Sequence, residues 1–145
     1  LHVYPLDSIR KKIAAVEEMK TDLDIKNLFP ICDRAENLSQ KFDIITSRAV
    51  AQMDVILKYA MPLLKDKGYF VAYKSKKAPG EIQEAKNTLK RYKAKVVAVI
   101  EYKLQLQEVY ERNLIICQKH ATNWPIYAYY DIIKFVILKE IVFKS

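Results

Sequence analysis

Charged side chains follow two apolar stretches of the sequence, at the points where buried strands are expected to end. Arg48 comes just after the stretch 42–46, and the lysine-rich run 74–77 follows the stretch 69–73. A helix predicted over 53–64 joins the two stretches, and a strand–helix–strand unit makes its two strands parallel. Parallel strands end at the same edge of a sheet, where ligands bind in open α/β folds. The charged side chains are therefore expected to share one binding edge.

Acidic residues occupy the same kind of position earlier in the chain. Residues 1–6 read as a strand that Pro5 interrupts, and Asp7 follows it at the start of a helix. An acidic residue there could accept hydrogen bonds from a ribose or serve as the helix N-cap, as Ser8 also could. The apolar residues expected to pack this helix on the sheet are Ile9, Ile13, Val16 and Met19. A second short strand over 27–32 precedes the acidic turn Asp33-Arg34-Ala35-Glu36, which could contact an adenine, position a loop or begin a helix.

The remaining elements complete an open α/β sheet. The pattern predicts a helix over 79–92 and two strands over 95–104 and 112–118, which form an antiparallel pair that closes the sheet edge. The fold class is therefore α/β, mostly parallel, with an antiparallel last strand. A glycine turn is expected at Gly68. The predicted core stripe of the 53–64 helix is Val55, Ile56, Tyr59, Ala60, Leu63 and Leu64.

The charge of the chain and its distribution indicate what kind of molecule the protein could bind. The 145 residues carry a net charge of +8, and residues 74–95 hold eight basic and two acidic side chains, which is most of the excess. Such a basic face favours a polyanion such as RNA, although a solvated lysine-rich helix gives the same pattern. Cys32 and Cys117 both lie in apolar runs, so we expect reduced, buried thiols of a cytoplasmic protein rather than a disulfide or metal site. No stretch predicts a clean membrane span.

Five short motifs, taken together, resemble one family. They are DSIRKK (7–12), DRAE (33–36), TSRAVA (46–51), GYFVAYK (68–74) and ERNLI (111–115). In type and order they are similar to the glucose-inhibited division protein B family, the bacterial 16S ribosomal RNA small-subunit methyltransferase G. The resemblance implies a Rossmann-like class I methyltransferase. It would transfer a methyl group from S-adenosyl-L-methionine to N7 of a guanine in 16S ribosomal RNA of the small subunit.

The same resemblance implies roles for individual residues. Asp7 would lie near the cofactor ribose, and Ala35 and Glu36 would lie against its adenine end. Arg48 would line the pocket for cofactor and substrate, unless it only caps a neighbouring turn. The side chains expected to face RNA are Lys74, Lys76 and Lys77, any of which could serve. The family pattern implies no metal.

The chain departs from the family in two places. The family's first strand and the glycine-rich loop after it are missing, because the only glycines are Gly68 and Gly80. We therefore expect residues 1–120 to be a partial methyltransferase domain, the carboxyl-terminal two-thirds of the enzyme. Residues 121–145 form a divergent hydrophobic tail where the family has a basic segment; a buried helix, an added strand or a frameshifted segment all fit it.

Two functions from different classes follow. The first is a methyltransferase whose cofactor pocket is completed by upstream residues. The second is a non-catalytic fragment or degenerate copy that binds RNA through its basic 74–95 segment. The isolated chain is expected to be inactive and not to bind cofactor in either case. The lone histidines, His2 and His120, are expected to play no catalytic part.

Overall fold

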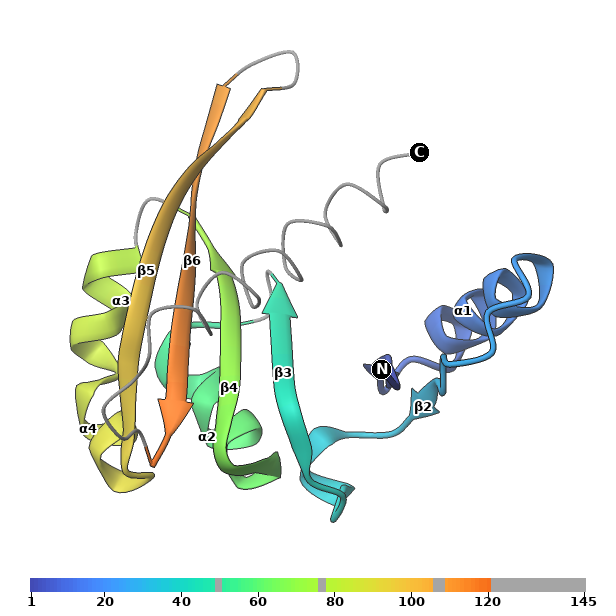
Figure 1. Ribbon diagram of the computed structural model, residues 1–145, viewed down its shortest axis with the longest axis horizontal. Helices are drawn as coiled ribbons and strands as arrows, with labels where there is room; N and C mark the ends of the chain where they lie inside the picture. Colours follow the sequence, from blue (N-terminus) through green and yellow to red (C-terminus); the bar gives the residue numbers. More distant parts are fainter. Residues whose placement is uncertain (49–50, 76–77, 106–108, 121–145) are drawn as a thin grey trace.

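The computed structural model describes residues 1–48, 51–75, 78–105 and 109–120. The predicted tail and the side chains of Lys76 and Lys77 lie outside these residues. In chain order the elements are β1 (Leu6–Asp7), α1 (Arg10–Asp22), β2 (Ile31–Cys32), the 3₁₀ turn η1 (Ala35–Asn37), β3 (Phe42–Arg48), α2 (Met53–Leu63), β4 (Leu64–Lys74), α3 (Ala78–Glu84), α4 (Lys86–Arg91), β5 (Ala94–Gln105) and β6 (Val109–Lys119). Figure 1 shows their arrangement.

The larger sheet has four strands in the order β3-β4-β6-β5. β3 and β4 are parallel, as the strand–helix–strand pattern predicts. β6 is antiparallel to both of its neighbours, so the prediction of an antiparallel last strand is confirmed. The predicted antiparallel pair of β5 and β6 closes the sheet edge, with β5 outermost and β6 between β4 and β5 (Figure 1). Residues 113–118 of β6 are all buried, as expected for a strand with a neighbour on each side.

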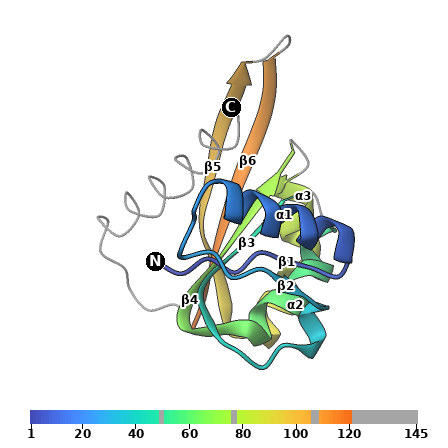
Figure 2. The ribbon, with the colours of Figure 1, turned by 90° about the vertical axis from the view of Figure 1, so that its right-hand side faces the viewer.

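Helix α2 packs its apolar side on one face of this sheet together with α3 and α4 (Figure 2). The buried residues of α2 are Met53, Leu57, Ala60, Met61 and Leu63. The predicted stripe was wrong in part, since Val55 and Tyr59 are 39% and 38% exposed. Nearly every side of this helix is apolar, so its spacing alone did not decide which stripe faces the sheet. Helix α2 ends at Leu63, one residue after Pro62, and a proline near the end of a helix disfavours its continuation.

Two further elements differ from their predicted form. β4 begins at Leu64 rather than Tyr69, and Gly68 lies inside a shift of register between β3 and β4 instead of a free turn. The helix predicted over 79–92 is divided at Ala85 into α3 and α4. Ala85 is fully buried, its N–H donates to the Glu81 carbonyl at 3.0 Å and its own carbonyl accepts the Leu89 N–H at 2.9 Å, so helical hydrogen bonding continues across the division.

The first third of the chain forms a separate small unit. β1 and β2 pair in parallel over only two residues each, with one more bridge between Val3 and Leu28. The strands predicted over 1–6 and 27–32 are therefore mostly irregular, because prolines at positions 5 and 30 remove ladder donors. Within α1 only Ile13 is buried, so the predicted packing of a whole apolar stripe is wrong.

The two cysteines have different environments. Cys117 is fully buried in β6, as predicted, and burial raises the pKa of its thiol to about 12. It is therefore a neutral, inert core residue at physiological pH. Cys32 is exposed, which corrects the prediction that both thiols are buried. The short β2 strand leaves it on the surface of the small unit.

Candidate functional site

The candidate site lies at the carboxyl ends of the parallel strands. Arg48 is the last residue of β3 and pairs in register with Tyr73 of β4. Asp7 is the last residue of β1 and pairs in register with Cys32, so the turn that follows β2 starts beside it. The structure thus brings Asp7 and residues 33–37 to one edge of the small sheet. Arg48 stands at the corresponding edge of the other sheet, and no strand of the described chain joins the two sheets.

Asp7 is held in a defined orientation at the start of α1. Its Oδ1 accepts a hydrogen bond from the Ile9 N–H at 2.8 Å, and its Oδ2 accepts one from Lys12 Nζ at 3.2 Å. These donors, the Ile9 N–H first, lower the pKa of the Asp7 carboxyl. The residue at the N-cap position of α1 is Ile9, so the prediction of Asp7 or Ser8 at that position is wrong by one or two residues. The carboxylate is ionised at neutral pH and its oxygens keep free lone pairs for a hydroxyl donor.

The turn after β2 is organised by Asp33. Its Oδ1 accepts hydrogen bonds from the Asn37 side-chain amide at 2.6 Å and from the Arg34 N–H at 2.7 Å. The Asn37 bond, followed by the Arg34 bond, lowers the pKa of this carboxyl. The acidic turn was predicted to contact an adenine, to position a loop or to begin a helix. The hydrogen bonds of Asp33 are those of a residue that positions the loop. It closes the turn that carries Ala35 and Glu36, with the Glu36 side chain exposed.

Lys74 has partners that sequence reasoning did not foresee. Its ammonium lies 2.7 Å from Glu81 Oε2 and also donates to the Ala51 carbonyl. The same Glu81 oxygen accepts the Met53 N–H at 2.9 Å, at the first turn of α2. The side chains of Lys74 and Glu81 are only 11% and 19% exposed. Lys74 therefore joins β4, α2 and α3, and its contact with RNA stays a prediction.

The candidate site contains both acidic and basic side chains. Asp7 and Glu36 supply carboxylates near the small sheet, and the exposed Arg48 supplies a cation at the end of β3. This combination suits a ligand with hydroxyl and amine donors on one side and an anionic group on the other. Among the described residues, no group of three or more histidine, cysteine, aspartate or glutamate side chains could hold a metal ion. Within that same part of the chain, no helix is long and apolar enough to cross a membrane.

Solved methyltransferases share this fold. The rRNA methylase from Streptococcus thermophilus superposes with a TM-score of 0.56 at 16% identity, covering 83% of this chain and 74% of that one. The N-methyltransferase NodS from Bradyrhizobium japonicum, solved with S-adenosyl-L-homocysteine, gives a TM-score of 0.62 at 11% identity, covering 83% of this chain and 67% of that one. The predicted fold class, a Rossmann-like class I methyltransferase sheet, is confirmed.

Sequence comparison identifies the family. The ribosomal RNA small subunit methyltransferase G of Bacillus licheniformis is 33% identical over 127 residues, which are 83% of this chain and 53% of the relative. The protein of the same name from Limosilactobacillus reuteri is 36% identical over 126 residues, 82% of this chain and 52% of the relative. The chain thus spans about half the length of the curated relatives it matches. The model of the family described as rRNA small subunit methyltransferase G matches residues 1–115. The chain belongs to the rRNA small subunit methyltransferase G family.

Proposed function

We propose that this chain forms the carboxyl-terminal part of an S-adenosyl-L-methionine-dependent methyltransferase acting on N7 of a guanine in 16S ribosomal RNA, in the cytoplasm. The observation that carries the proposal is the family match over residues 1–115, within which Asp7 and the 33–37 turn share one strand edge. The relatives' name supports the substrate class. The bound forms among the structural neighbours support the cofactor class.

The residues of this edge suit the cofactor. An ionised Asp7 with free lone pairs can accept hydrogen bonds from ribose hydroxyls, and the turn closed by Asp33 presents Ala35 and Glu36 to the adenine end. When bound, the cofactor supplies a methyl carbon that its sulfonium makes strongly electrophilic. Guanine N7 already has an exposed lone pair, so the new N–C bond forms as the S–C bond breaks, without a general base. The task of the protein is to align the two groups and to exclude water.

We further propose that one additional strand lies between β1 and β3 and completes the pocket. Among the described strands, β1 pairs only with β2 and β3 only with β4, and the small unit lies beyond β3 in Figure 1. Several large apolar side chains of the small unit are substantially exposed: Leu6, Ile9, Met19, Leu23 and Phe29. Unpaired strand edges beside exposed apolar side chains are a site for strand addition. This supports the partial domain expected for residues 1–120.

Isothermal titration calorimetry with S-adenosyl-L-methionine tests the proposal. We expect no measurable heat from the isolated 145-residue chain, because the proposed additional strand would supply part of the pocket wall. A fusion that places the amino-terminal part of the Bacillus licheniformis relative before Leu1 should bind the cofactor. The fusion should also methylate small ribosomal subunits that lack this modification. Binding by the isolated chain would refute the additional strand, and a folded fusion without binding would favour a non-catalytic copy.

Replacing Arg48 by alanine in that fusion should weaken ligand binding without unfolding the protein. Arg48 is exposed at the end of β3, so its loss leaves the core unchanged. The loss of one charge-assisted hydrogen bond would reduce affinity for cofactor or RNA by about 10- to 100-fold. Calorimetry and thermal melting measure the two effects, with Lys103→Ala, which removes an exposed charge on β5 outside the site and the basic segment, as the control. A large fall in Tm with unchanged affinity would make Arg48 structural.

A further inference from the structure

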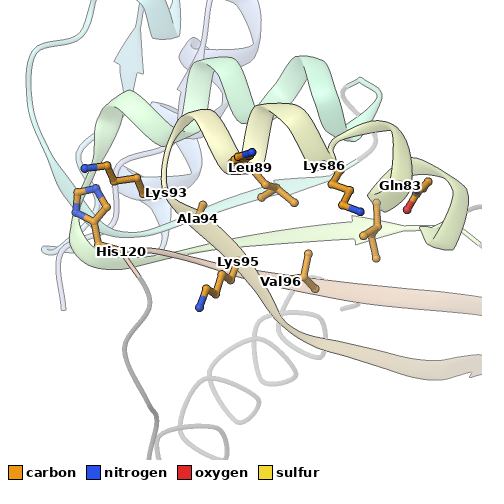
Figure 3. Close-up of a pocket in the computed structure, with 10 residues that line it drawn as sticks. Gln83, Lys86, Leu89, Lys93, Ala94, Lys95, Val96 and His120 are labelled. Carbon is orange, nitrogen blue, oxygen red and sulfur yellow. The ribbon is translucent and has the colours of Figure 1, made fainter.

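A basic groove lies between the α3–α4 helices and strand β5, away from the candidate site. It has a volume of about 940 Å³, and Figure 3 shows side chains of α4, of β5 and of His120 around it. Four of the lining residues are lysines, all with exposed side chains: Lys86, Lys90, Lys93 and Lys95. Its floor is apolar and includes Leu89 and Val96. The groove thus combines a hydrophobic base with a rim of cations.

The four lysines have no carboxylate partner in the described part of the chain. Of the acidic residues in the same basic segment, Glu81 is engaged by Lys74, and Glu84 does not line the groove. The nearby Asp66 pairs with His120, whose Nδ1 lies 3.0 Å from the Asp66 carboxylate. Lysines without neutralising partners create a local positive potential, which attracts polyanions and raises their rate of association. The groove is therefore a site of net positive charge, rather than a set of surface ion pairs.

The groove is separate from the cofactor edge. Lys95 of β5 pairs with Gln118 of β6, and Gln118 pairs with Tyr69 of β4. Lys95 therefore lies at the same height in the sheet as Tyr69, the first residue of β4 that pairs with β6. Lys74, at the carboxyl end of β4, is five residues further along that strand, or about 17 Å. The lysines of β5 and of the preceding turn therefore occupy the amino-terminal edge of the sheet. A ligand held at the Lys93 and Lys95 end of the groove would therefore not compete with the cofactor for space.

We propose that this groove binds the sugar-phosphate backbone of the RNA substrate as a second contact, remote from the methylated base. Lysine ammonium groups are point-charge ligands for phosphate, and several along one groove match the repeated charge of a nucleic-acid strand. This rests on the proposed function for the identity of the polyanion, but the binding itself requires neither cofactor nor catalysis. Phosphate contacts of this kind fix the orientation of the RNA without reading its sequence.

The edge position of β5 offers a different explanation for one of these lysines, Lys95. Charged side chains on an edge strand prevent pairing with another chain, and Lys95 lies on such a strand. The two explanations predict different consequences when the charges are removed. Loss of edge protection produces dimers or aggregates, whereas loss of phosphate contacts reduces RNA affinity and its dependence on salt.

The test measures binding of a fluorescein-labelled RNA stem-loop to the 145-residue chain by anisotropy at several salt concentrations, without cofactor. The groove variant carries glutamine at the four lysine positions. Its matched control carries Lys11→Gln, Lys26→Gln, Lys41→Gln and Lys103→Gln and has the same net charge. We expect the slope of log affinity against log salt to fall by about 3 to 4 in the groove variant, with affinity lower on the order of 100-fold. The control should change far less.

Three results would overturn the proposal. They are equal losses in the two variants, unchanged RNA binding by the groove variant, or a groove variant that dimerises in size-exclusion chromatography but keeps its RNA affinity. If the quadruple variant fails to fold, the double variant Lys86→Gln, Lys90→Gln on α4 replaces it, with about half the change in slope expected. Because no cofactor is present, failure here leaves the proposed methyl transfer untouched, and failure of the calorimetric test leaves this proposal standing.

Discussion

Replacing Glu81 by alanine is expected to lower the stability of the fold by about 3 kcal/mol, or roughly 10 °C in Tm. One carboxylate oxygen of Glu81 receives both the Lys74 ammonium and the Met53 N–H. Its removal leaves the Lys74 ammonium, on a side chain that is 11% exposed, without an anionic partner, and the Met53 N–H at the first turn of α2 without an acceptor. Uncompensated groups of this kind are among the costliest consequences of a single substitution. Thermal and urea denaturation of the 145-residue chain measure the effect.

Further variants separate the two causes. Glu81→Gln removes the charge but keeps an oxygen that can accept the Met53 N–H, so it should cost less than alanine. Adding Lys74→Met to Glu81→Gln should recover most of the loss, because no buried charge then remains unpaired. As a control, Asp43→Asn breaks the exposed Lys65–Asp43 pair, in which the aspartate is 81% exposed, and should leave Tm nearly unchanged. Equal effects of the Asp43 and Glu81 substitutions would show that burial does not set the cost.

The role of Lys74 shows where sequence reasoning about the site stops. A lysine directly after a predicted strand is equally consistent with a ligand contact and with an internal anchor. Which of these two roles Lys74 has depends on its partner Glu81, seven positions later in the sequence. Glu81 reaches Lys74 only because α3 packs next to the end of β4. This packing is a tertiary contact, and no local sequence pattern predicts it. In contrast, the position of Arg48 at the end of β3 follows from the apolar stretch 42–46 and the polar residues after it.

The same distinction applies to the fold. The order of helices and strands from β3 to β6 could be predicted, because each element has its own periodicity and its own terminating residues. The insertion of β6 between β4 and β5 could not, since strand order depends on which surfaces become buried together. The apolar run from Leu114 to Cys117 is consistent with an internal strand, and it is the feature of the sequence that could have indicated this position. In the small unit, two-residue strands lack the length for any reliable signal.

Replacing each of the two glycines by alanine is expected to change the stability of the chain in opposite directions. Gly68→Ala should destabilise the chain by about 2 kcal/mol, or about 6 °C in Tm. A methyl group on Gly68 would lie 2.9 Å from the Lys65 carbonyl oxygen and 3.0 Å from that of Asp43. Both atoms belong to the backbone at the shift of register between β3 and β4, so they cannot move aside without disturbing the ladder. Glycine is needed here for close backbone approach, because no glycine of the described chain has a positive φ.

Gly80→Ala is the matched control, with an effect of opposite sign. A methyl group there has no heavy atom within 4 Å, and Gly80 lies in α3, where alanine is the better helix former by up to about 1 kcal/mol. The two variants add the same single carbon to the same chain, so their difference in Tm isolates the local environment. A stable Gly68→Ala protein would mean that β3 and β4 can separate locally at little cost. The amino-terminal end of the β3–β4 pair, five residues before Arg48 on β3, would then tolerate a wider strand separation than the structure shows.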